Sequence, residues 1–259
     1  MSTADGWGPH GRGAARAAPA CDAAGVTAAG ADRRDEWVWL SYEQDAAVSC
    51  LRRGWDVLAD YRFAATEAEP LFVLLATGTE KLLKLTYGLT VQADSGSWPS
   101  QEAMGARGGW GHRVADLDAE CRSLLRAGVD RAVYPHYVTG LLDALDADRY
   151  VVPWLTALQR YATNGRFYNL DHLADAVQRQ PSPRVLWEEL YNSVALADPQ
   201  HTQLIGRSQA DWDALIQRTT GRLADSLWLW WETYYRAWVQ GACGPEARRD
   251  SGTLAPPKR

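Results

Sequence analysis

LADSLWLWWETYYRAWV, residues 223–239, is the most hydrophobic stretch of the chain. Its large apolar side chains return at steps of three and four residues, which is the spacing of one face of an α-helix. Asp225, Glu232 and Arg236 interrupt the stretch, and three charges make it a poor bilayer span. The pattern predicts a long helix over about 208–239 and no membrane segment.

The aromatic side chains of this predicted helix have two interpretations. Trp231, Tyr234 and Trp238 lie near one face, and further tryptophan and tyrosine side chains broaden it. Such a face could be a platform on which bases stack. Aromatic stripes at helical spacing more often belong to a core or a dimer contact.

Helical periodicity extends through most of the chain upstream of this segment. Helices are predicted over about 36–62, 69–90, 114–128, 131–147, 149–163, 170–179 and 185–196. No alternating pattern of strand length and no solenoid repeat occurs. The sequence therefore predicts an all-α protein, an antiparallel bundle of at least five helices.

Both ends of the chain differ in composition from this helical part. Residues 1–34 contain runs of Gly and Ala without Leu, Ile or Phe, and residues 243–259 are similarly poor in large apolar side chains. Such segments have little to bury against the entropy of ordering. We expect two disordered tails, 1–34 and 243–259, around one helical domain at 35–242.

Composition also limits the partners and the compartment. The formal net charge is −5, so the basic excess of a general nucleic-acid binder is missing, and any RNA contact would need a local patch. The four cysteines show no paired spacing of a disulfide framework or zinc knuckle. No signal-peptide pattern stands out. These features favour a cytoplasmic protein.

No metal or cofactor motif is recognisable. None of the five histidines follows a Glu by three residues, as the ligand pairs of di-iron bundles require, and no Cys/His spacing suits zinc. The glycine-rich phosphate loops and the nucleophile elbow are missing as well. We therefore expect neither a metal ion nor a cofactor.

Three polar clusters are the candidates for chemistry. Glu80 and Lys84 are spaced to meet on one helical face among leucines, either as a surface ion pair or as part of a site. His112 stands at the start of a helix, where a structural role is the more common one. Between residues 160 and 172, one helix boundary gathers many polar side chains: Arg160, Arg166, Tyr168, Asn169 and His172.

The order of these motifs resembles the HEPN superfamily of helical bundles. Glu80-x-x-x-Lys84 precedes Gly-His112-x-x-x-x-Leu, and the spacing from Arg166 to His172 resembles the Arg-x(4–6)-His signature of the superfamily's ribonucleases. The resemblance covers about residues 36–180. It departs in one respect, because Phe167 follows Arg166 where active members commonly carry a polar residue. Asn169 is the nearest substitute.

The resemblance implies a homodimer and a metal-independent endoribonuclease, serving bacterial defence or a stress response. His172 would then be the acid–base group, which fits the ready proton exchange of histidine near neutral pH. Arg166 would hold the phosphate. Two alternatives stay open, a non-catalytic helical scaffold that binds proteins and a bundle that binds a small apolar ligand.

Overall fold

The computed structural model describes residues 28–105 and 108–258, and every regular element in these ranges is helical. Val38 and the described residues after it form one compact unit, and the described residues before Val38 belong to another. The prediction of an all-α fold is confirmed.

Eight helices correspond to the eight predicted from periodicity. They are α1 (Ala28–Ala59), α2 (Ala64–Ser95), α4 (Val114–Ala127), α5 (Pro135–Ala147), α6 (Val151–Arg160), α7 (Tyr168–Leu173), α8 (Pro183–Leu196) and α10 (Gln209–Gln240). Shorter elements lie between and after them: α3 (Gln101–Met104), α9 (His201–Leu204), α11 (Pro245–Asp250), 3-10 turns at Val129–Arg131 and Ser251–Thr253, and a π-helical turn at Tyr161–Gly165. Helix α1 begins inside the predicted tail 1–34, whose residues 1–27 lie outside the described residues.

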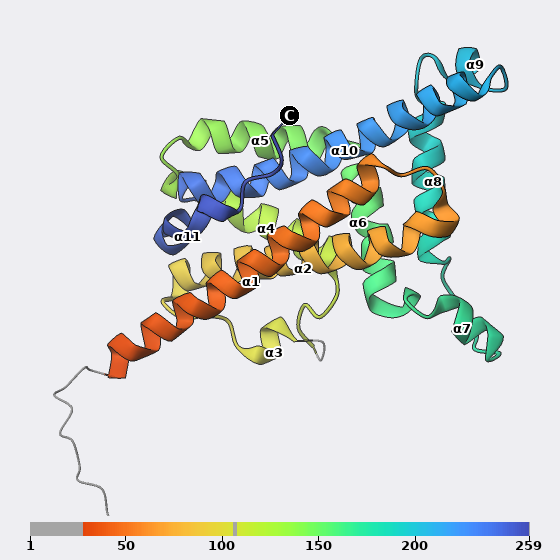
Figure 1. The fold of residues 1–259 in the computed structure, drawn as a ribbon. Helices are drawn as coiled ribbons and strands as arrows, with labels where there is room; N and C mark the ends of the chain where they lie inside the picture. The colour runs from red at the N-terminus through yellow and green to blue at the C-terminus, as the bar shows by residue number, and fades with distance from the viewer. Residues whose placement is uncertain (1–27, 106–107, 259) are drawn as a thin grey trace, which may run out of the picture. The chain divides into compact units, whose positions relative to one another are not determined.

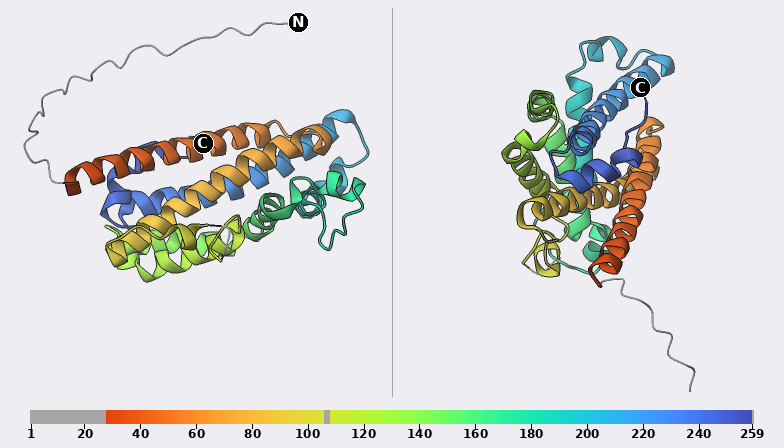
Figure 2. Two further views of the ribbon diagram at one scale, coloured as in Figure 1. Left: turned by 90° about the horizontal axis from the view of Figure 1, so that it is seen from below. Right: turned by 90° about the vertical axis from the view of Figure 1, so that its left-hand side faces the viewer.

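Helix α10 is the element around which the bundle packs (Figures 1 and 2). It contacts α5 and α8 most extensively, while α4 packs on both α2 and α6. Trp230, Trp231, Tyr234 and Trp238 of α10 are at most 1% exposed, so this aromatic face is the core of the bundle. The interpretation as a platform for stacking bases is wrong, because the rings are covered by the chain's own helices.

A buried carboxylate ties α4 to α10. The Asp118 side chain is fully buried and accepts hydrogen bonds from Trp230 Nε1 at 2.7 Å and from the Tyr234 hydroxyl at 2.8 Å. Its other oxygen lies 2.7 Å from Arg122 Nη2, one helical turn along α4. Burial raises the pKa of Asp118, although Arg122 and the two aromatic donors act in the opposite direction.

The end of the chain is folded, which corrects the predicted disordered tail at 243–259. Cys243, Ala247 and Leu254 are fully buried. The carbonyl oxygen of Leu254 accepts from Trp231 Nε1 at 2.8 Å, and that of Asp250 accepts from Gln44 Nε2 at 2.7 Å. Composition could not predict this order, because the segment contributes backbone acceptors to buried donors more than it contributes large apolar side chains.

Gly78 marks the closest approach of α1 and α2. A Cβ atom at this position would lie 2.8 Å from Leu51 Cγ and 2.9 Å from the Leu51 backbone nitrogen. A glycine in the middle of a helix either allows close packing or is merely tolerated. The structure shows close packing, since no side chain fits between the two backbones.

We expect Gly78→Ala to destabilise the protein by about 1–3 kcal/mol, the usual cost of overpacking a core. Gly140→Ala is the matched control, because Gly140 is an exposed mid-helix glycine of α5 with nothing within 4 Å of its added Cβ. It is expected to stabilise the fold by about 0.5–1 kcal/mol through helix propensity. Urea unfolding of both variants measures the difference, and a stabilising Gly78→Ala would contradict close packing there.

Candidate functional site

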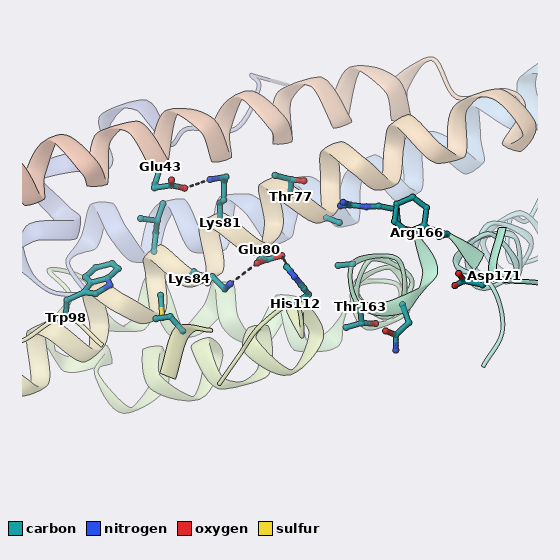
Figure 3. A pocket seen from close by; sticks show the side chains of 16 residues that line it. Glu43, Thr77, Glu80, Lys81, Lys84, Trp98, His112, Thr163, Arg166 and Asp171 are labelled. Carbon is teal, nitrogen blue, oxygen red and sulfur yellow. Dashed lines mark hydrogen bonds and ion pairs between the residues drawn. The ribbon is translucent and has the colours of Figure 1, made fainter. Parts of the chain in front are cut away.

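A cleft of about 770 Å³ opens beside α2, and charged side chains from distant parts of the sequence line it (Figure 3). Glu43 comes from α1, Glu80, Lys81 and Lys84 come from α2, His112 precedes α4, and Arg166 follows the π-helical turn. The fold thus brings into one cleft three features that are separate in the sequence: the Glu80–Lys84 pair, His112 and Arg166.

Glu80 contacts two other side chains of the cleft, those of Lys84 and His112. Its Oε1 atom lies 2.8 Å from Lys84 Nζ, and its Oε2 atom lies 2.9 Å from His112 Nδ1. The Glu80 side chain is 18% exposed and that of His112 is 53% exposed. Because a carboxylate only accepts hydrogen bonds, Nδ1 of His112 carries a hydrogen, and a neutral ring then has its free lone pair on Nε2.

The segment between α2 and α4 brings His112 to Glu80. Trp110 packs edge-on against Tyr87 of α2, with ring centroids 5.5 Å apart, and its backbone N–H donates to the Ala103 carbonyl at 3.0 Å. Trp98 of the same segment lines the cleft. The described residues between α2, which ends at Ser95, and α4 therefore pack back on α2 and hold His112, two residues after Trp110, in place.

Arg166 enters the cleft directly after the π-helical turn. Such turns are rare and occur frequently at functional sites. Gly165, the last residue of the turn, is buried, and a Cβ there would lie 2.3 Å from Pro183 Cγ. The Arg166 guanidinium lies 5.6 Å from the Tyr161 ring centroid and forms no ion pair with a carboxylate of residues 36–105 or 108–258.

Several lining residues could not be identified from the sequence. Lys81 pairs with Glu43 across the α1–α2 contact, and Thr163 and Asn164 come from the π-helical turn. Pairs that lie within one helical turn, such as Glu80 and Lys84, can be read from spacing. The contact between Lys81 and Glu43 joins residues 38 positions apart, so no local pattern indicates it.

The other predicted site residues lie elsewhere. His172 is exposed on α7 and does not line the cleft. Asn169 and Tyr168 line a neighbouring hollow. Arg160 is 6% exposed, donating to the Pro181 carbonyl at 2.9 Å and to Gln178 Oε1 at 3.2 Å, so it holds the following segment in place. One chain therefore brings Arg166 together with His112, not with His172.

Within the described residues, no group of three or more His, Cys, Asp or Glu side chains is arranged to hold a metal ion. None of the described helices is long and apolar enough to cross a membrane. Comparison with protein-family models, curated proteins and solved structures finds no match to this chain.

Proposed function

We propose that this chain is a metal-independent endoribonuclease that cleaves single-stranded RNA in the cleft beside α2, with His112 as the acid–base group. The observation that carries the proposal is the contact of His112 Nδ1 with Glu80 Oε2 at 2.9 Å, in a cleft that also receives Arg166. A histidine oriented by a carboxylate is a recurring arrangement for proton transfer. The resemblance to HEPN ribonucleases supports the same reaction class.

The proposed reaction uses these groups as follows. Nε2 of His112 accepts the proton of an RNA 2′-hydroxyl, and the 2′ oxygen attacks the adjacent phosphorus. The bond from phosphorus to the 5′ oxygen breaks, and that oxygen takes a proton from solvent. The products are a 2′,3′-cyclic phosphate and a 5′-hydroxyl end. Arg166 offers the phosphate a guanidinium that no carboxylate of the described residues neutralises.

Glu80 serves this chemistry as a positioning residue. It fixes the ring of His112 and stabilises the imidazolium that forms once the proton has been taken. Lys84, 2.8 Å from the same carboxylate, keeps Glu80 in place and adds positive charge near the phosphate. The overall charge of −5 does not oppose RNA binding at such a site, because screening limits charge effects to about 10 Å at 0.1 M salt.

Arg166→Ala is expected to weaken binding of a short single-stranded RNA and to make the salt dependence of its affinity shallower, because one phosphate contact is lost. Arg166→Lys restores binding only in part, since an ammonium cannot make the bidentate fork. Fluorescence anisotropy over a series of salt concentrations measures both effects. Arg126→Ala is a suitable control, because Arg126 is already paired with Asp143 at 3.0 Å and lines neither the cleft nor the neighbouring hollow.

A protein that binds no RNA, or an Arg166→Ala variant with unchanged salt dependence, would count against the proposal. One observation favours the alternative of a non-catalytic interaction module. Leu170, Leu173 and Val177 expose 62%, 81% and 85% of their surface, and exposed apolar patches often mark protein contacts. The homodimer and the role in bacterial defence or stress rest on the HEPN resemblance alone.

A further inference from the structure

A second hollow of about 410 Å³ adjoins the cleft, and Arg166 and Phe167 line both. Its floor is aromatic, because the buried rings of Phe72 and Tyr161 stack there with centroids 5.4 Å apart. Phe167 is 59% exposed on the wall between the two spaces. An RNA strand whose phosphate lies at Arg166 therefore has, next to that phosphate, a space with a flat and apolar floor for a base.

The polar groups of this hollow include an acceptor that suits hydrogen-bond donors. Glu69 lines it and accepts a hydrogen bond from the Tyr161 hydroxyl at 2.7 Å. No lysine or arginine of the described residues forms an ion pair with Glu69, so its carboxylate has lone pairs left to accept further hydrogen bonds. Arg166 and Arg184 line the same hollow and suit a phosphate, whereas the Glu69 carboxylate suits a neutral ring with N–H groups.

We propose that this second hollow is a nucleobase subsite with a preference for guanine, next to the phosphate-binding cleft. The proposal rests on the proposed function for the position of the phosphate. Among the four RNA bases, guanine alone presents two adjacent donors, N1–H and N2–H, on its Watson–Crick edge. These two donors match the two oxygens of one carboxylate, that of Glu69, in a bidentate pair.

Two further residues of the hollow fit a base. The exposed ring of Phe167 offers a face for stacking, and such stacking accounts for about 5-fold to 150-fold in affinity per base. Asn169, on the α7 side of the hollow, is exposed and carries both a donor and an acceptor. Phe167 occupies the position at which active HEPN members commonly carry a polar residue. Stacking on a base would explain an aromatic residue at this position.

The test measures binding of guanosine, adenosine, cytidine and uridine to the full chain by calorimetry or NMR titration. Wild-type protein is expected to bind guanosine at least about 5-fold more tightly than the other three, the lower limit for a bidentate base contact. Glu69→Gln should lose this preference and shift it toward adenosine, because an amide matches the donor–acceptor edge of adenine. Phe167→Ala should weaken binding of all four.

Glu189→Gln is the matched control, because it removes the same charge from an exposed position on α8 outside both spaces. Its guanosine preference should equal that of the wild type. Equal affinities for the four nucleosides, no detectable binding, or an unchanged preference in Glu69→Gln would overturn the subsite. Because nucleosides carry no phosphate, a positive result stands even if the protein cleaves no RNA, in which case the proposed reaction alone fails.

Discussion

His112→Ala is expected to slow RNA cleavage about 10²–10⁴-fold, the usual contribution of a positioned acid–base group. The imidazole is the one group of the cleft that contacts Glu80 through a ring nitrogen and has a second ring nitrogen to accept a proton. Its side chain is 53% exposed, so its removal leaves no cavity in the core. Initial rates on a short labelled RNA, measured with a chelator present, give the size of the effect.

Two other histidines make this prediction specific. His136 is exposed on α5 and lines neither the cleft nor the second hollow, so His136→Ala should leave the rate unchanged. His172→Ala separates the two assignments of the acid–base group, since the motif spacing favours His172 and the geometry of one chain favours His112. Full activity in His112→Ala together with its loss in His172→Ala would refute the role of His112.

Asp118→Ala is expected to lower the free energy of unfolding by about 2–6 kcal/mol. The change removes the acceptor of Trp230 Nε1–H and of the Tyr234 hydroxyl, both of which are fully buried. Each buried donor left without a partner costs about 1–3 kcal/mol. Arg122 is less affected, because Asp146 remains its partner. Chemical denaturation followed by tryptophan fluorescence measures the loss.

Asp146→Ala is the control for Asp118→Ala, because it removes a carboxylate from the same arginine at a position that is 45% exposed. The Asp146 carboxylate is largely solvated, and ion pairs at the surface contribute about 0–1 kcal/mol, so the variant should lose much less stability than Asp118→Ala. Equal stability losses in the two variants would show that the buried hydrogen bonds of Asp118 contribute little.

The pH dependence of Asp118→Asn follows from the raised pKa of Asp118. A carboxyl whose pKa is higher in the folded protein than in the unfolded chain stabilises the fold fully at pH values below roughly 3.9. That contribution is lost as the pH rises through the folded-state pKa. An amide cannot ionise, so the stability of Asp118→Asn relative to the wild type should increase from about pH 4 toward pH 7.

The helices were predictable because the interactions that favour them join residues close together in the sequence. The apolar period of residues 223–239 reflects interactions within a few residues, and the structure places α10 over these residues accordingly. The C-terminal segment was not predictable. Its order depends on hydrogen-bond donors in Gln44 and Trp231, which lie far away in the sequence. The composition of the segment does not show that these donors need an acceptor.

The candidate site was predictable in its parts and not in its assembly. Glu80 and Lys84 are four residues apart on α2, and helical geometry alone brings them together. His112 lies 32 residues from Glu80, and its contact depends on how Trp110 packs against Tyr87. The spacing of Arg166 and His172 indicated a shared site, but α7 carries His172 to an exposed position outside the cleft.

The contact between Gln44 and the segment at Asp250 also has a consequence for biosynthesis. The two residues are 206 positions apart, so a ribosome that adds about 5–20 residues per second needs about 10–40 s to make the second after the first. During that time α1 has emerged, while the carbonyl that binds its buried amide does not yet exist. The surface that residues 243–254 later cover is then open to chaperones. The bundle closes there only after these residues have been made, although nearly all of its helices are predictable from local sequence.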